Sequence, residues 1–266
     1  MPKITGPGRL PGTLSLSKFA RAGAMRDFLE FYAFRDRYFH IDDFDGDAIN
    51  LDYYALAAAG AAAAVFATNV QNGTGVVRGS TGTDDNAATS LVGPIIFRGD
   101  NNCGIWARLK LDAVTSCELE VGFVDAVPGS AGPAFSAVAP TAVAADAAVI
   151  HFDTDEASAA LDRIHLLTVG STANQDAKAT SFGLDAVAAT FLDVTLQIIG
   201  NDVVSTVSIG TTGQVTVSHN NGTSGNAAGH VEGGVSLAPW VYCRTRSTTP
   251  VLCDLDAIAV WSDRIA

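Results

Sequence analysis

The stretch IWARLKLDAVTSCELEVGFV, residues Ile105 to Val124, decides the fold because it holds two runs of alternating side chains. In both runs the apolar residues stand at odd positions, 105–111 and 117–123, while Glu118 and Glu120 stand between them. A period of two is typical of a strand with one buried face. We therefore predict two strands, joined through residues 112–116 into an antiparallel β-hairpin. Both glutamates should then lie on the outer, solvent-facing side.

Short apolar runs separated by turn residues recur along the rest of the chain. The expected strands are 76–77, 91–98, 148–154, 163–170, 191–199, 203–209, 214–219, 235–244 and 255–262. Residues 53–68 are ambiguous, because their alanines favour a helix while Tyr53, Val65 and Phe66 favour a strand. Many short strands with regular polar turns, and no repeat of 20–50 residues, predict an all-β antiparallel sandwich or barrel.

Charge is distributed unevenly along the 266 residues. Residues 1–40 hold seven basic and three acidic side chains, a net charge of +4. Since the net charge of the whole chain is −12, residues 41–266 carry −16. An acidic body argues against general nucleic-acid binding, which needs clustered lysine and arginine. A basic arm on an acidic body instead favours docking between subunits.

The N-terminal residues differ from the body in pattern. Residues 1–18 are rich in Gly, Pro, Ser and Thr and predict an extended arm. Residues 19–34 space their apolar side chains as an amphipathic helix does, after the N-cap candidate Ser17. We therefore divide the chain into an arm with a short helix, 1–39, and a sandwich domain, 40–266. The start lacks an apolar signal segment, and no run is long enough for a membrane span, so we expect a soluble protein made in the cytoplasm.

No recognisable set of catalytic, metal-binding or cofactor-binding residues is found. Cys103, Cys117, Cys243 and Cys253 contain no CxxC spacing, and the acidic run at 43–47 does not match a calcium loop. The cysteines are expected to be free buried thiols, with a Cys243–Cys253 bond across a hairpin as the alternative. The histidines are scattered and no phosphate-binding glycine loop occurs. We expect no enzyme activity, no metal and no cofactor.

Several motifs nevertheless resemble one family. They are Asp43-Phe44, the glycine-rich segment 73–82, IWARLKL followed by CELEVGFVDA, and the closing strand Asp256-Ala257-Ile258-Ala259-Val260-Trp261-Ser262-Asp263-Arg264. Together they resemble the concanavalin A-like lectin/glucanase jelly roll, in the form found in tailed-phage virion proteins, over about residues 42–264. The alanine run 57–64 departs from that pattern.

This resemblance implies three classes of function. Glycoside hydrolases of the fold carry a pattern similar to Glu-x-Asp-x-x-Glu on one strand, and here Glu118-Leu119-Glu120 lacks the third acid. Lectins need exposed aromatic side chains, for which Trp106, Trp240 and Trp261 are candidates. The third class, a capsid decoration (cement) protein on the virion surface, best fits the charge distribution and the absence of catalytic residues.

The decoration hypothesis also predicts partners and contact residues. The partners would be a major capsid protein and other copies of the chain, most simply as a homotrimer, with surface glycans as the alternative and no nucleic acid or membrane. The arm would bind through basic and aromatic side chains. The expected contact residues are Arg9, Lys18, Phe19, Arg21, Arg26, Phe28, Phe31 and Tyr32.

Overall fold

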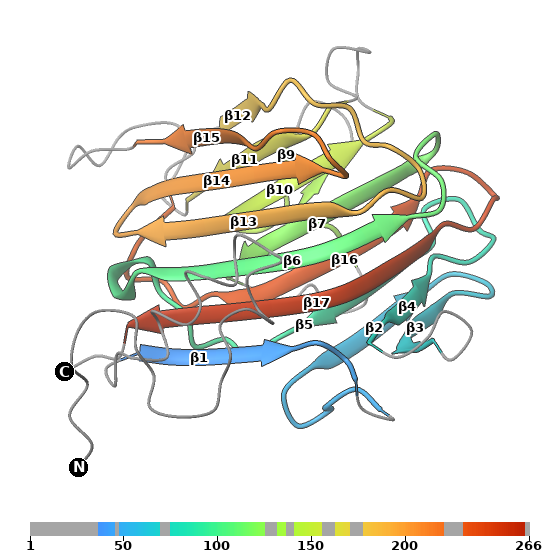
Figure 1. Cartoon of the computed structure of the whole chain (residues 1–266), viewed down its shortest axis with the longest axis horizontal. Helices are drawn as coiled ribbons and strands as arrows, with labels where there is room; N and C mark the ends of the chain where they lie inside the picture. The colour runs from blue at the N-terminus through green and yellow to red at the C-terminus, as the bar shows by residue number, and fades with distance from the viewer. Residues whose placement is uncertain are drawn as a thin grey trace.

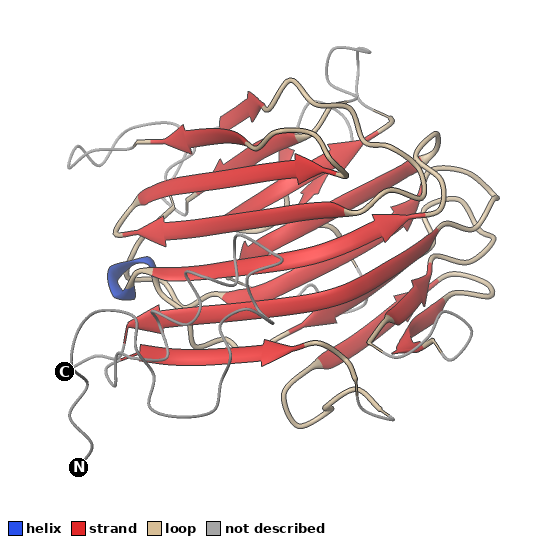
Figure 2. Ribbon diagram, in the orientation of Figure 1, coloured by secondary structure: helices blue, strands red, loops and turns tan. Residues whose placement is uncertain are grey.

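Two antiparallel β-sheets packed face to face make up the structure (Figures 1 and 2). It is a computed structural model that describes residues 37–45, 48–69, 75–125, 132–136, 141–155, 163–170, 178–220 and 231–263. Within these ranges no α-helix occurs, which confirms the predicted all-β jelly-roll sandwich. The expected arm and helix lie outside the described residues, apart from residues 37–39. No described helix has the length and apolarity needed to cross a bilayer.

The first sheet has the order β15–β14–β13–β6–β17–β4–β3, with β1 also paired to β17. Its strands are β1 (Arg37–Asp42), β3 (Ala64–Thr68), β4 (Val77–Ser80), β6 (Cys103–Leu111), β13 (Leu192–Ile199), β14 (Asp202–Ile209), β15 (Val215–His219) and β17 (Leu252–Asp263). Strand β17 is long enough to pair with β4 through residues 252–255 and with β1 through residues 258–263.

The second sheet has the order β12–β11–β10–β7–β16–β5–β2. Its strands are β2 (Ala55–Ala59), β5 (Ala88–Val92), β7 (Cys117–Val124), β10 (Ala147–Asp153), β11 (His165–Val169), β12 (Lys178–Ser181) and β16 (Ala238–Thr245). Strand β7 lies at the centre of this sheet, between β10 and β16.

The predicted hairpin at residues 105–124 is wrong in its pairing, although both strands exist. Strand β6 pairs with β13 and β17 in the first sheet, while β7 pairs with β10 and β16 in the second. The segment 112–116 therefore crosses from one sheet to the other. Alternation determines which face of a strand is apolar but does not determine its partner. Placing β6 and β7 in opposite sheets brings both apolar faces into one core.

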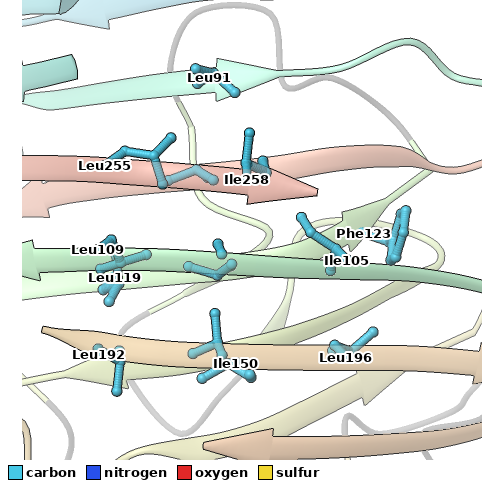
Figure 3. Packing of buried hydrophobic residues seen from close by; sticks show 14 of the residues in the cluster. Leu91, Ile105, Leu109, Leu119, Phe123, Ile150, Leu192, Leu196, Leu255 and Ile258 are labelled. Atoms are coloured by element: carbon cyan, nitrogen blue, oxygen red, sulfur yellow. The ribbon is translucent and has the colours of Figure 1, made fainter. Parts of the chain in front are cut away.

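That core lies between the sheets and is built from the odd-numbered residues identified in the sequence. Ile105 and Leu109 from β6 meet Leu119 and Phe123 from β7, and Ile150 from β10 packs beside them (Figure 3). All five side chains are buried. Removing this much apolar surface from water is the main stabilising contribution to the sandwich.

A second apolar cluster covers the opposite, outer face of the second sheet. It joins Trp240 and Tyr242 of β16 to Val149 of β10 and to Phe135, all of them buried. Phe135 belongs to a small two-stranded sheet formed by β8 (Phe135–Ser136) and β9 (Thr141–Ala142). We call the described residues 134–136 and 141–144 the strap. The strap lies over this face, and the central strands β7 and β10 are buried on both sides, whereas the edge strands β2 and β12 are partly exposed.

The observed bounds of the strands correct or resolve three further expectations from the sequence. Strand β1 begins at Arg37, so the sandwich starts before the expected boundary at residue 40. The ambiguous segment 53–68 forms two strands, β2 and β3, separated by a turn in which Gly60 has φ +102°. Strand β5 ends at Val92, before Pro94, because proline cannot donate to a sheet ladder.

All four cysteines are buried free thiols, as expected. Cys243 and Cys253 do not face each other across a hairpin, because β16 and β17 belong to different sheets. Both side chains belong to the core between the sheets, and the proximity of Cys253, together with burial, raises the pKa of Cys243.

Candidate functional site

Charged side chains gather on the outer face of the second sheet, beside the strap. Strand β7 contributes Glu118 and Glu120, and β10 contributes His151 and Asp153, which pair in register with them. Strand β16 contributes Arg244 opposite Glu118, and Arg246 follows one residue after this strand. The six residues share a face because each strand places alternate side chains on the same side.

The two glutamates are not on the surface, contrary to the expectation from β7 alone. Glu118 and Glu120 are both 0% exposed. The apolar alternation correctly placed them on the outer face, but that face is covered by the strap and by the arginines. Buried carboxylates need charged or hydrogen-bonding partners, since an isolated buried charge is strongly unfavourable.

Glu118 is held by both arginines. Its Oε2 lies 2.5 Å from Nε of Arg244 and 2.9 Å from Nη2 of Arg246. Its Oε1 lies 3.4 Å from Nε2 of His151, and neither of these two atoms has a hydrogen-bond partner among the described residues. A change in the protonation of His151 therefore acts directly on Glu118.

Asp153 forms the other half of the ion-pair network. Nε of Arg246 donates to Oδ1 of Asp153 at 2.9 Å, and Nη2 contacts Oδ2. The remaining Nη1 donates to Oδ1 of Asn86, also at 2.9 Å. Arg246 thus links Asp153 to Glu118 and is itself anchored outside the sheet.

Glu120 is held by N–H donors rather than by arginine. Its Oε2 accepts the backbone N–H of Ala134 and the indole N–H of Trp240, each at 2.8 Å, and its Oε1 accepts the backbone N–H of Phe135 at 2.9 Å. Two of the three donors belong to the strap. Burial, together with the charge of Glu118, raises the pKa of Glu120 to about 7 despite these hydrogen bonds.

The cluster has one carboxylate more than it has guanidinium groups. Among the buried groups, Glu118, Glu120 and Asp153 face Arg244 and Arg246, which leaves a charge of −1 when His151 is neutral. Asp155 lies 4.0 Å from Arg246 but is 55% exposed, so it is solvated and is not counted with the buried groups. Burial disfavours the imidazolium form of His151, but Glu118 and the other carboxylates outweigh burial and raise its pKa. One added proton makes the cluster neutral.

A metal ion fits the cluster less well than a proton. Ligand atoms of Glu118, Glu120 and His151 lie within 4.8 Å of one another. Glu118 is already neutralised by two arginines, and both oxygens of Glu120 accept N–H groups. A divalent ion would change the buried charge from −1 to +1, whereas one proton brings it to zero. The arrangement is therefore an ion-pair network.

The third acid of the glycosidase pattern has no counterpart here. Counting from Glu118, its position falls on Phe123, which is buried in the core. Asp125 lies beyond the end of β7. A retaining or inverting glycosidase needs two free carboxyl groups across a sugar cleft. The two glutamates on β7 are instead hydrogen-bonded or ion-paired and covered.

The three tryptophans occupy different environments. Trp240 is fully buried and stacks on Tyr242, with ring centroids 5.6 Å apart and planes at 10°. Trp261 is 8% exposed and packs over Gly104. Trp106 is half-buried on the outer face of the first sheet. Of the three lectin candidates, Trp106 is the one whose ring is accessible to a ligand.

The eight expected contact residues of the arm all lie outside the described residues. The structure instead brings together His151, Asp153, Arg244 and Arg246, which the sequence interpretation missed. A usable signal existed, because His151 and Asp153 have the same parity on one predicted strand. Arg244 is the last residue of the expected strand 235–244, and Arg246 lies two positions further, so both point to the same side if the strand continues.

No protein-family model and no curated protein sequence matches the chain. Among solved structures it is similar to a protein of unknown function from Shewanella oneidensis MR-1, with TM-score 0.55 and 13% identity over 96% of this chain and 97% of that one. It is similar to peanut lectin with TM-score 0.56 and 8% identity, over 86% and 99% of the two chains. It is also similar to a beta-1,3-glucanase from Mycobacterium marinum, with TM-score 0.56 and 13% identity over 84% and 97%. These matches define the class of fold, the lectin/glucanase jelly roll, and they do not decide between binding and catalysis.

Proposed function

We propose that the chain is a non-catalytic structural sandwich, and more specifically a decoration protein on the capsid of a tailed phage. The observation that carries the non-catalytic part is the state of Glu118 and Glu120. Both carboxylates stand on the strand where the glucanase pattern would be, and both are fully buried and occupied by donors. A carboxyl group in such contacts is unable to act as a nucleophile or a proton donor toward a sugar.

The decoration role is supported by charge and by the sequence resemblance. The acidic body and the basic N-terminal segment are complementary, so the segment of one copy is attracted to the body of another copy. In this proposal the same segment reaches over neighbouring capsid subunits. The proposed partners are the major capsid protein and further copies of the chain in a homotrimer. The proposed location is the outer surface of the virion. Many weak contacts would add up over a particle through multivalency.

Deleting residues 1–36 tests this role while leaving β1 intact. A cut after residue 39 would remove Arg37–Phe39, which pair with Trp261–Asp263 of β17. The shortened protein should stay folded and lose its attachment to purified capsids in a co-sedimentation assay. A charge-reversed full-length variant, with Arg9, Lys18, Arg21 and Arg26 changed to glutamate, should also fail to attach. Attachment equal to that of the full chain in both variants would refute the proposal.

Carbohydrate binding is the second candidate, favoured by the fold likeness to peanut lectin and by the accessible ring of Trp106. A glycan array with the full chain should then show selective binding that is lost in Trp106→Ala. The matched control is Thr195→Ala, which alters the residue opposite Trp106 on β13 without removing an aromatic ring. An array without any selective signal would exclude this candidate.

A further inference from the structure

The strap is fastened to the second sheet through one carboxylate. Strands β8 and β9 pair with each other and belong to neither large sheet. Within the described part of the chain, both hydrogen bonds between the strap and β7 end on Glu120, from the N–H groups of Ala134 and Phe135. The other contacts are made by Ala134 and Phe135, which belong to the apolar cluster with Trp240, and the ring of Phe135 lies edge-on to His151 with ring centroids 6.4 Å apart. Among the described residues, Glu120 is therefore the ionisable side chain that hydrogen-bonds the strap to β7.

Charged and titratable side chains from several neighbouring elements surround Glu120. They are Glu118 of β7, His151 and Asp153 of β10, the exposed Asp155 after β10, His165 of β11, Tyr242 and Arg244 of β16, Arg246 after β16, and Asp146 at the base of the strap. Tyr242 is neutral because burial raises its pKa. The pKa of His165 is lowered by burial, so it is uncharged near neutral pH. The carboxylate of Asp146 accepts a hydrogen bond from the backbone N–H of Glu232.

We propose that the strap is a proton-controlled cover, closed while the buried cluster around Glu120 holds one extra proton and released when that proton passes to solvent. The buried cluster is neutral with this proton and carries −1 without it. An uncompensated buried charge is costly, and the cost is relieved if water reaches the carboxylate. Opening the strap admits that water. The inference does not depend on the role proposed for the whole protein.

The direction of the pH effect follows from linkage. The closed strap raises the pKa of Glu120 from its ordinary value of 4.5 to about 7, and a hydrated carboxyl in the open form returns toward 4.5. The closed form therefore binds the proton more tightly, so lower pH favours closure and higher pH favours opening. His151 acts in the same direction, because its pKa is also raised in the closed form.

Opening would uncover an aromatic surface that is otherwise buried. The stacked rings of Trp240 and Tyr242 and the side chain of Val149 lie beneath Phe135. In the closed form Trp240 is 0% exposed and its indole N–H is bonded to Glu120. Release of the strap frees both the ring and its donor. The cover thus controls access to one aromatic patch on the outer face of the second sheet.

Hydrogen exchange on the full chain at about pH 6 and about pH 9, corrected for intrinsic exchange rates, tests the proposal. Protection of the Ala134 and Phe135 amides should fall by about tenfold or more, since each pKa unit corresponds to a factor of ten. Protection of β13 and β14 in the other sheet should stay constant. Acrylamide quenching of Trp240 should increase in parallel, with Trp106 and Trp261 replaced by phenylalanine to isolate its signal. Equal protection of the two amides at both pH values would overturn the proposal, whatever the variants do.

Two variants sharpen the test. Glu120→Gln removes the surplus charge, so protection at residues 134 and 135 should lose most of its pH dependence, with only the part contributed by His151 remaining. His165→Gln changes a buried histidine that has no ion pair with the charge cluster, and it should keep the pH dependence of the parent protein. A Glu120→Gln protein that folds and retains the full pH dependence would show that another group controls the strap.

Discussion

The guanidinium of Arg246 meets the carboxylate of Asp153 side-on, with Nε 2.9 Å from Oδ1 and Nη2 against Oδ2. The same Nη2 lies 2.9 Å from Oε2 of Glu118. One arginine therefore compensates two carboxylates that come from neighbouring strands of the second sheet. The side chain of Arg246 is 3% exposed, so water does not replace it when it is removed.

Arg246→Met should destabilise the protein by about 3–5 kcal/mol, because it leaves Asp153 buried without a cation. Urea unfolding followed by circular dichroism measures this loss. The matched control is Arg163→Met, which breaks an exposed ion pair with Asp185 at 3.3 Å. It should change the free energy of unfolding by about 0.5 kcal/mol or less. Similar losses for the two variants would contradict the role given to Arg246.

Gly122→Ala should loosen the contact between β7 and β10. A Cβ added at Gly122 would lie 2.1 Å from the carbonyl oxygen of Ala148. The strands must move apart to accept it, and such overpacking costs about 1–3 kcal/mol. The shift in urea midpoint measures the effect. Gly213→Ala is the control, because nothing lies within 4 Å of the added atom, and an equal shift there would contradict the close approach at Gly122.

His219 should make stability depend on acid pH. Its Nδ1 lies 2.7 Å from Oγ1 of Thr168 and its Nε2 lies 2.9 Å from Oγ1 of Thr180, so it bridges the end of β15 to β11 and β12. Burial, aided by Lys178, lowers its pKa from 6.5 to about 4. Between these values the unfolded chain binds the proton and the folded chain does not. The stabilising contribution is therefore complete above pH 6.5 and is lost as pH falls toward 4.

Urea midpoints measured between pH 4 and pH 7 check this dependence. His219→Leu should reduce the slope over this range while lowering stability at pH 7, since both threonine hydroxyls lose their partner. Ser218→Ala, an exposed neighbour on the same strand, should keep the parent slope. An unchanged slope in His219→Leu would assign the acid sensitivity to other groups.

The cysteines should be unreactive in the folded protein. All four are buried, and burial raises the pKa of Cys103 and Cys117 to about 12, so little thiolate forms at neutral pH. A chromogenic disulfide reagent should label none of them in the native state and all four in urea. Rapid labelling of the native protein at constant structure would contradict this burial.

The sequence predicted the faces of the strands better than their partners. Alternation correctly placed Ile105 and Leu119 in the core and the two glutamates of β7 on the opposite side. It did not indicate that β6 and β7 belong to different sheets, because that choice depends on pairing with β13 and β17 for β6 and with β10 and β16 for β7, all of them later in the chain. The short edge strand β12 was missed, since KATS has no apolar pattern of its own.

The charge cluster could be predicted only in part. Glu118 and Glu120 were recognised as a pair, but their burial depends on Phe135 and Arg246, which are distant in sequence and carry no motif. A strand that alternates apolar and acidic residues looks half-exposed unless its cover is known. The register that aligns His151 with Glu120 and Asp153 with Glu118 likewise emerges only from the folded sheet.

The pairing of β1 with β17 joins the two ends of the sandwich, since Arg37 stands opposite Asp263. Segments attached before Arg37 and after Asp263 therefore leave the domain at one corner. A short linker between these two positions would give a circular permutant, with new ends opened in the turn between β13 and β14. In such a permutant the strap and the charge cluster would keep their positions, while the attachment point would move to another side of the molecule.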